Sequence, residues 1–214
     1  MKKGFIAREG MKLIIPSLVL FVLLFIARAY ILSSIVFLFF LFCLFFFRNP
    51  VRTSTAPENV LLSPADGKVL EIGKIREEEF INDTVQKIGI FMSPADVHVN
   101  RAPCEGRIAK MLHRRGQFAL AFKKDIDKDN ERNYILIDHR GERLLLVQIA
   151  GFLARRIIAY VKEDDHVNRG EAVGMIAFGS RVDIYFPNNY ETVVKLHQRV
   201  KAGITPLAQK KGEI

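Results

Sequence analysis

The stretch Val173-Gly174-Met175-Ile176-Ala177-Phe178-Gly179-Ser180-Arg181-Val182-Asp183-Ile184-Tyr185-Phe186 carries the most information about the fold and the chemistry of this chain. Aliphatic and aromatic residues lie on both sides of Gly179-Ser180, a composition that is typical of β-strands. We therefore expect two strands here, with Gly179-Ser180-Arg181 at the tip between them.

The Gly179-Ser180 pair permits an unusual backbone reaction. Glycine leaves its own carbonyl accessible and tolerates a strained conformation, so the hydroxyl of Ser180 can attack the carbonyl carbon of Gly179. The peptide bond would become an ester, and elimination from the serine would break the chain. The remnant of Ser180 would be a pyruvoyl group, which is a ketone at a new N-terminus. An isolated Gly-Ser pair is ordinarily a turn, so this interpretation depends on the remainder of the chain.

From Pro50 onward the chain contains short strand-like runs separated by turn residues. Helical periodicity is weak after residue 60, and two of the runs, Tyr134–Ile137 and Leu144–Ile149, form a hairpin pattern. We expect a mainly β fold, a compact β sandwich or barrel. Residues 63–69 and 102–108 share one pattern, small–Pro–x–acid–Gly–basic–aliphatic. With the Gly turn in residues 165–174, this pattern resembles the barrel-sandwich hybrid fold of biotinyl and lipoyl carriers.

The N-terminal region, residues 1–49, is expected to anchor the chain in a membrane. Leu13–Ala27 and Ile31–Phe47 are apolar runs near the lower length limit for a bilayer span, and Arg28 lies between them. They form either a helical hairpin or a pair of helices partly inserted in one leaflet. The apolar region is too long for a cleaved signal peptide. Residues 48–57 form a linker by composition, and from Pro50 to residue 214 the chain reads as an ordinary soluble domain.

The charge distribution predicts a cell-membrane location with the domain on the cytoplasmic side. Seven basic residues and one acidic residue lie in residues 1–52, and they account for six of the nine net positive charges. Basic residues on both flanks of a hairpin place both ends in the cytoplasm and attract anionic headgroups. The small net charge of the remaining residues, 53–214, argues against a nucleic-acid partner. The two cysteines, Cys43 and Cys104, are poorly placed to pair, and no Cys/His cluster indicates a metal.

Four segments of the chain form an ordered set with the Gly-Ser pair near its end: residues 63–69, 91–103, 151–157 and 170–181. Together they resemble the phosphatidylserine decarboxylases, in particular the short form with an N-terminal membrane segment. The resemblance extends from about residue 50 to about residue 190. It implies a proenzyme that cuts itself between Gly179 and Ser180. The β chain (1–179) and the α chain (180–214) would remain associated, and Ser180 would become the covalent pyruvoyl cofactor.

The resemblance implies the conversion of phosphatidylserine to phosphatidylethanolamine and carbon dioxide in phospholipid biosynthesis. Loss of the carboxylate leaves electrons on the α carbon that an unmodified protein cannot delocalise. A pyruvoyl carbonyl forms a Schiff base with the substrate amine and takes up these electrons. The lipid substrate and the membrane are therefore the expected partners. No metal and no diffusible cofactor are needed.

His98 is the candidate general acid–base, because a histidine can deliver a proton near neutral pH. Asp66 lies in a Pro-x-Asp-Gly turn, where aspartate is common because its side chain hydrogen-bonds to the turn backbone. The resemblance adds a role in self-cleavage, in which the aspartate pairs with a histidine three residues after the match to His98. That position is Arg101 here. Either Asp66 assists self-cleavage without a histidine, or His98 serves both self-cleavage and decarboxylation, or backbone strain at Gly179-Ser180 provides most of the driving force for self-cleavage.

Further candidates are charged. Asp96 either orients His98 or caps a turn. Arg101, Arg155 and Arg156 could bind the phosphate of the substrate, because arginine binds phosphate oxygens with paired hydrogen bonds, or they could form a solvated basic face. Adjacent strand residues point to opposite faces, so Arg155 and Arg156 would not both serve. The other histidines are interpreted as surface residues: His113, His139, His166 and His197.

Two alternatives remain. The first is a membrane-tethered carrier or adaptor of the barrel-sandwich hybrid fold that lacks self-cleavage. Carriers present a lysine at a hairpin tip, whereas Gly179-Ser180-Arg181 is expected at the tip here, which disfavours this alternative. The second is the same enzyme acting on an archaeal serine ether lipid. The sequence does not separate these two substrates, because they differ in tails that lie in the bilayer.

Overall fold

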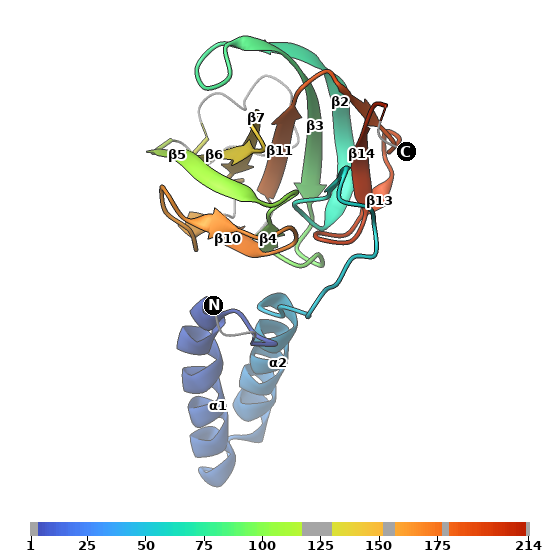
Figure 1. Cartoon of the computed structure of the whole chain (residues 1–214). Helices are drawn as coiled ribbons and strands as arrows, with labels where there is room; N and C mark the ends of the chain where they lie inside the picture. The colour runs from blue at the N-terminus through green and yellow to red at the C-terminus, as the bar shows by residue number, and fades with distance from the viewer. Residues whose placement is uncertain (1–3, 117–129, 152–156, 177–179, 213–214) are drawn as a thin grey trace. The chain divides into compact units, whose positions relative to one another are not determined.

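The computed structural model describes residues 4–116, 130–151, 157–176 and 180–212. The chain divides into two compact units, Met1–Val51 and Arg52–Ile214 (Figure 1). The first unit is helical and the second is built from strands. The prediction of a mainly β fold behind an apolar helical segment is therefore confirmed.

The helical unit is a pair of helices joined by a tight turn. The short 3-10 helix η1 (Arg8–Gly10) leads into α1 (Met11–Ile26), and α2 (Tyr30–Phe46) follows. Arg28 has a φ of 62°, which reverses the chain between the helices. At the open end of the pair, the backbone N–H of Ala7 donates to the carbonyl of Phe47 over 2.8 Å.

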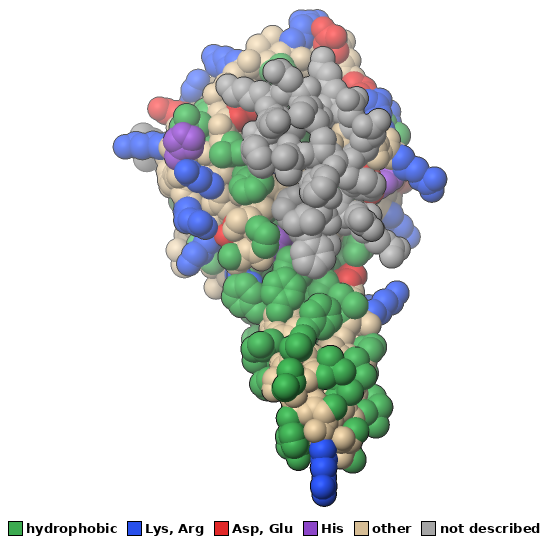
Figure 2. Space-filling view, turned by 180° about the vertical axis from the view of Figure 1, so that it is seen from behind, with side chains coloured by type: hydrophobic (Ala, Val, Ile, Leu, Met, Phe, Trp, Pro, Cys, Tyr) green, Lys and Arg blue, Asp and Glu red, His purple; other side chains and the backbone are tan. Residues whose placement is uncertain are grey.

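The surface of the helical unit is strongly apolar. Ile31 is 83% exposed, and most of the large side chains of both helices are exposed as well (Figure 2). The helical segment Arg8–Ile26 is long and apolar enough to cross a membrane, whereas α2, with 17 residues, is slightly shorter. A contiguous exposed apolar surface of this extent is typical of a segment that contacts lipid or another protein.

The β unit contains three sheets. The largest has eight strands in the order β13-β2-β3-β11-β7-β6-β5-β9, and it curls around the core (Figure 1). The two smaller sheets have the orders β4-β10-β8 and β1-β14-β12. The strands are β1 (Val60–Leu62), β2 (Gly67–Glu77), β3 (Asp83–Met92), β4 (Val99–Arg101), β5 (Gly106–Arg114), β6 (Arg132–His139), β7 (Glu142–Ile149), β8 (Ile157–Ala159), β9 (His166–Val167), β10 (Ala172–Ile176), β11 (Ser180–Phe186), β12 (Tyr190–Thr192), β13 (Arg199–Val200) and β14 (Pro206–Lys210).

The strands on either side of Gly179-Ser180 belong to different sheets. β10 pairs with β4 and β8, whereas β11 pairs antiparallel with β3 and β7. The expectation of a strand-to-strand tip at Gly179-Ser180-Arg181 is therefore wrong. Ser180 and Arg181 are the first ladder residues of β11, and their exposed fractions are 0% and 2%. The physical reason is that the hydrogen-bonding partners of β11 lie in the large sheet, so the two strands cannot pair with each other.

The two faces of β11 have different surroundings. Val182, Ile184 and Phe186 point into the main core, together with Ile88 and Ile90 of β3. The opposite face carries an ionic cluster, which we define as Glu71, Lys87, Arg181 and Asp183; Arg181 and Asp183 are buried, whereas the Glu71 side chain is 33% exposed. Its contacts include Arg181 Nε to Asp183 Oδ1 at 2.5 Å and Lys87 Nζ to Asp183 Oδ2 at 3.2 Å. The cluster is balanced, with two charges of each sign, and it fixes β11 next to β3 immediately after Ser180.

The ionic cluster predicts a loss of stability in acid. Burial by itself would raise the pKa of Glu71, but hydrogen bonds and charges from Arg181 and Lys87 outweigh it, so the pKa is lowered overall. The stability that ionised Glu71 contributes is fully present above the pKa of glutamate in the unfolded chain, about 4.3. It is lost as the pH falls through the lower pKa of Glu71 in the folded protein. Thermal unfolding in detergent between about pH 5 and 3 should therefore depend less on pH in Glu71→Gln than in the wild type. The exposed Glu191→Gln is the control, and equal slopes in all three proteins would contradict the prediction.

Candidate active site

Ser180 is fully buried at the first position of β11, where its backbone lies opposite Met92 of β3. Its Oγ is 3.5 Å from the Sδ atom of Met92. A thioether is a weak hydrogen-bond acceptor, so this contact positions the hydroxyl without holding it strongly. The neighbouring Gly179 lies outside the described residues.

His98 is also fully buried, directly before β4. Its carbonyl accepts a hydrogen bond from the backbone N–H of Ile176 over 3.3 Å. Ile176 is the last residue of β10 and precedes Ser180 by four positions. The structure therefore holds the His98 backbone against the strand that leads into the Gly179-Ser180 bond.

A chain of buried side-chain amides lies beside Ser180. Asn100 Nδ2 is 3.4 Å from the same Met92 Sδ atom that Ser180 Oγ contacts. Gln148 Nε2 donates to Asn100 Oδ1 over 2.8 Å, and Asn133 Nδ2 donates to Gln148 Oε1 over 2.9 Å. All three amide residues are at most 3% exposed. Buried polar groups that satisfy one another in this way favour a single arrangement of the elements that carry them.

The amide chain connects the sheet that contains β10 with the sheet that contains β11. Asn100 belongs to β4 in the small sheet, whereas Gln148 and Asn133 belong to β7 and β6 in the large sheet. Gly174 of β10 packs against Gln148, and a Cβ atom at this position would lie 2.8 Å from Gln148 Nε2. β10 of the small sheet therefore packs closely against β7 of the large sheet.

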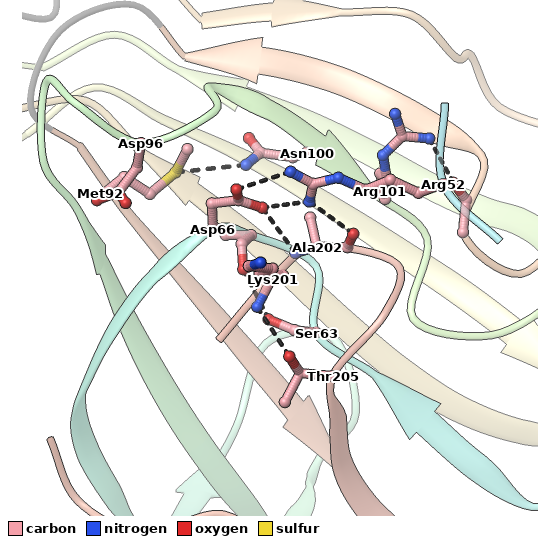
Figure 3. A network of polar contacts seen from close by, with 12 residues as sticks. Arg52, Ser63, Asp66, Met92, Asp96, Asn100, Arg101, Lys201, Ala202 and Thr205 are labelled. Atoms are coloured by element: carbon pink, nitrogen blue, oxygen red, sulfur yellow. Dashed lines mark hydrogen bonds and ion pairs between the residues drawn. The ribbon is translucent and has the colours of Figure 1, made fainter. Parts of the chain in front are cut away.

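Asp66 lies directly before β2 and is paired with Arg52 (Figure 3). Arg52 Nη2 donates to Asp66 Oδ2 over 2.8 Å, and a second, shorter hydrogen bond joins Nη1 to Oδ1. The backbone N–H of Ala202 also donates to Asp66 Oδ1 over 2.8 Å. The side chains of Arg52 and Asp66 are 7% and 11% exposed, so this is a nearly buried bidentate pair.

Gly67 allows Asp66 to approach the end of β3. Its φ is +154°, and a Cβ atom there would lie 2.0 Å from the carbonyl oxygen of Phe91. In the sheet, β3 lies between β2 and β11, with Lys68 opposite Phe91 and Ser180 opposite Met92. The starts of β2 and β11 are thus two strand spacings apart, about 10 Å. Asp66 and Ser180 therefore lie at the same end of the large sheet.

Arg101 replaces the expected histidine and lies in the same charged region. It is 8% exposed, and its Nη1 donates to the carbonyl of Gly170 over 2.9 Å. Burial lowers the pKa of Arg101, and the charge of Arg52 lowers it further, while Asp66 acts in the opposite direction. Phosphate binding by Arg101 stays a prediction. Arg155 and Arg156 lie outside the described residues.

The contacts of Asp96 favour turn capping over orientation of His98. Asp96 Oδ2 accepts hydrogen bonds from Ser93 N over 2.8 Å and from Ser93 Oγ over 2.6 Å. Asp96 Oδ1 faces Arg199 at 3.3 Å.

One histidine differs from the prediction. His139 is buried rather than on the surface, with Nδ1 2.7 Å from the carbonyl oxygen of Glu105. The backbone directly before β5 thus provides the imidazole with a polar partner inside the protein. His113, His166 and His197 are exposed as expected.

The partners that surround the predicted site were not predicted from the sequence. Arg52 is one of the charges expected to attract headgroups, but its guanidinium is buried against Asp66 and is not available to them. Gln148 could have been noticed as the one polar residue in the apolar run Leu144–Ile149. No similar signal distinguishes Met92. Among the residues that the structure describes, no group of three or more His, Cys, Asp or Glu side chains could hold a metal ion.

Comparison with known proteins identifies the family. Residues 39–208 match the model of the phosphatidylserine decarboxylase family. A phosphatidylserine decarboxylase proenzyme of Carboxydothermus hydrogenoformans is 47% identical over 182 residues, which are 85% of each chain. One of Pelagibacter ubique is 41% identical over 206 residues, 94% of this chain and 95% of that protein. The chain therefore belongs to the phosphatidylserine decarboxylase family.

A third relative differs in the lipid that its name gives. A putative archaetidylserine decarboxylase proenzyme of Methanocaldococcus jannaschii is 41% identical over 187 residues, 80% of this chain and 91% of that protein. The similarity thus extends to a relative named for a different serine lipid.

The Arg52–Asp66 pair yields a test of the processing machinery. Arg52→Met leaves the Asp66 carboxylate nearly buried without its bidentate partner, which should destabilise the fold by about 3 kcal/mol, at the low end for buried pairs. Adding Asp66→Asn removes the uncompensated charge and should restore most of the stability. If Asp66 takes part in self-cleavage, the double variant should nevertheless accumulate uncut chain, as measured by intact mass over time. Cleavage of the double variant at the wild-type rate would remove Asp66 from the processing step.

Proposed function

We propose that this chain is a membrane-anchored phosphatidylserine decarboxylase that converts its own Ser180 into the pyruvoyl group. The main observation is the position of Ser180, which is fully buried at the start of a central strand with its hydroxyl next to a weak acceptor. His98 and Asp66 come from the strand ends nearby. Family membership is the second support.

Self-cleavage in this proposal begins with attack of Ser180 Oγ on the carbonyl carbon of Gly179. The bond from that carbon to the Ser180 nitrogen breaks, which gives an ester and a free amine at residue 180. Loss of the Cα proton and cleavage of the Cβ–Oγ bond release the carboxylate of Gly179. Water then replaces the nitrogen of residue 180, ammonia leaves, and a ketone remains. The serine oxygen stays with Gly179, and the ketone oxygen comes from water.

The packing around Ser180 suits both states of this residue. Before cleavage, Met92 Sδ lies beside the hydroxyl. After cleavage, the side-chain carbon of residue 180 is a methyl group. The polarizable, apolar thioether of Met92 can pack against this methyl group.

The two products of cleavage have reason to remain associated. The α chain would begin at Ser180 and would retain the ladders of β11 with β3 and β7. It would also contribute β14, which pairs with β1. Separation would expose core residues such as Val182, Ile184 and Leu207, which are fully buried.

The pyruvoyl ketone would supply the electron sink for decarboxylation, in conjugation with the amide of Arg181. His98, buried near the end of β10, would deliver the proton to the α carbon of the substrate. Arg101, Arg155 and Arg156 remain the candidates for the substrate phosphate.

The apolar helices would keep the domain at the bilayer surface, where the serine headgroup lies. Two crossings with both ends in the cytoplasm follow from the basic flanks. Insertion in one leaflet remains the alternative, because a helix of 17 residues such as α2 spans about 25 Å, slightly less than the hydrocarbon core. In both cases the protein would be located at the cell membrane.

The two other functions remain distinguishable. A serine ether lipid presents the same headgroup, and the archaeal relative keeps that alternative open. A carrier or adaptor function is disfavoured by burial, because a carrier must present its attachment residue to partner enzymes. Ser180 and Arg181 are 0% and 2% exposed.

Ser180→Ala tests self-cleavage. Alanine preserves the packing but has no nucleophile, so this variant should stay at full length and release no carbon dioxide from phosphatidylserine. The wild type should separate into two fragments on a denaturing gel, the smaller of 35 residues from position 180 to 214. Ser63→Ala, which also removes a buried hydroxyl, is the matched control and should be cut. An active preparation that consists only of full-length chain would contradict the proposal.

His98→Gln separates the two chemical steps. Glutamine retains the size and hydrogen-bonding capacity of the side chain but not its acid–base chemistry. If His98 acts only on the substrate, this variant should be cut normally and should lose about 100-fold or more in decarboxylation rate. The exposed His166→Gln is the control. Full activity of His98→Gln would remove His98 from the mechanism, whereas an uncut chain would assign it to both steps.

A further inference from the structure

Two turns near the C-terminus present aliphatic side chains to solvent. Leu196 is 52% exposed in the turn before β13, and Ile204 is 39% exposed in the turn after it. Val193, close to the first turn, is 47% exposed. Isolated aliphatic residues on a surface need no explanation, but these three lie on one short segment that is otherwise rich in basic residues.

Both turns are fixed by hydrogen bonds. In the first, Lys195 N donates to Gln198 Oε1 over 2.9 Å and Gln198 N donates to the Lys195 carbonyl over 3.1 Å. In the second, Ile204 N donates to the Lys201 carbonyl over 3.1 Å, and Lys201 N donates to Thr205 Oγ1 over 2.9 Å. The hydrogen-bonded backbone of the two turns therefore keeps the side chains of Leu196 and Ile204 in contact with solvent.

The charge of this segment has one sign. No acidic residue occurs between Val193 and Pro206, and Lys195, Arg199 and Lys201 are exposed. Arg199 faces Asp96 at 3.3 Å but remains 75% exposed. We define the rim as these six residues: Val193, Lys195, Leu196, Arg199, Lys201 and Ile204. Aliphatic side chains interleaved with lysine and arginine are typical of surfaces that contact anionic lipid headgroups.

The rim lies next to the candidate active site. In the sheet, Arg199 is opposite Lys68 and Val200 is opposite Gly67, so β13 runs beside the residue that follows Asp66. Ala202, in the second turn, donates its N–H to Asp66. Contact between the rim and a bilayer would therefore bring this end of the large sheet close to the lipid headgroups.

The linker from the apolar helices passes the same surface. Thr53–Pro57 line a groove of about 500 Å³ together with Val193 and Ile204 of the rim. Arg52, which precedes this stretch, is fixed to Asp66 and follows the end of α2 at Phe46 by six residues. Such a length of chain spans at most about 20 Å. The chain segment that follows Arg52 thus runs along part of the rim.

We propose that the rim is a second membrane-contact surface, through which the β unit lies against an anionic phospholipid bilayer with Leu196 and Ile204 inserted among the headgroups. This inference deepens the proposed function, on which it rests for the location of the substrate. The apolar helices keep the protein at the membrane, and the rim orients the domain so that the start of β11 faces the lipid layer.

The chain offers a direct probe because it contains no tryptophan. Leu196→Trp places a single fluorophore at the rim, and Ile75→Trp places one at a comparably exposed position, 44%, on β2. Each full-length variant is reconstituted in vesicles of phosphatidylcholine and phosphatidylglycerol, with and without brominated phosphatidylcholine. Emission from the Leu196→Trp variant should shift to shorter wavelength and be quenched by the brominated lipid, whereas emission from the Ile75→Trp variant should not. Equal quenching in both variants, or none in Leu196→Trp, would overturn the proposal.

A second experiment links the rim to catalysis. Lys195→Gln/Leu196→Ser/Lys201→Gln alters only exposed side chains and should be cut at the wild-type rate. Its apparent KM for phosphatidylserine in anionic vesicles should rise several-fold, while kcat/KM for a short-chain monomeric phosphatidylserine should stay unchanged. Parallel losses with both substrates, or no loss with either, would contradict a docking role.

The two experiments also separate this proposal from the proposed function. If the wild type releases no carbon dioxide from either substrate, the proposed function fails, and tryptophan quenching still decides whether the rim contacts lipid. A concentration-dependent blue shift of the Leu196→Trp variant without quenching by brominated lipid would indicate contact with a second copy of the chain and would overturn the proposal.

Discussion

The structure depends on how β11 enters the large sheet. From its first residue, the strand pairs with β3 on one side, and from its second residue it pairs with β7 on the other. The preceding strand, β10, is committed to a different sheet. Ser180 is therefore fixed by its pairing with β3, and the residue after it by both β3 and β7, while the preceding strand belongs to a different sheet. A nucleophile held in this way loses little entropy when it reacts, and the ladders of β11 do not depend on the bond before Ser180.

Polar side chains hold the surroundings of this strand in place at three positions. The amide chain of Asn100, Gln148 and Asn133 spans the two sheets. On the other face of β11, Arg181 joins the ionic cluster. At the edge, Arg52 fixes Asp66. Buried polar groups of this kind cost free energy unless they are fully paired, so they are weak contributors to stability and better explained as devices that specify one arrangement.

Much of the fold could be predicted from local sequence. The hairpin run from Tyr134 to Ile149 became β6 and β7, and the apolar runs around Arg28 became α1 and α2. The pairing of β10 and β11 could not be predicted, because both runs read as strands and only long-range contacts decide which sheet each one joins. The partner of Asp66 was missed for the same reason. Arg52 reads as a flanking charge of a membrane segment, and only the folded chain brings it to a carboxylate fourteen residues away. His98 and Ser180 could be named as candidates from motifs, whereas Asn100, Gln148 and Asn133 belong to no motif.

The central claim is that Ser180 ceases to be a serine when the enzyme matures. The most direct measurement is the mass of the 180–214 fragment from active, purified protein, compared with the mass calculated for the same fragment with an intact N-terminal serine. The account predicts a fragment that is lighter by one molecule of ammonia and that gains two hydrogens on treatment with borohydride. A fragment with the mass of the unmodified serine form, or an active chain that was never cut, would contradict it.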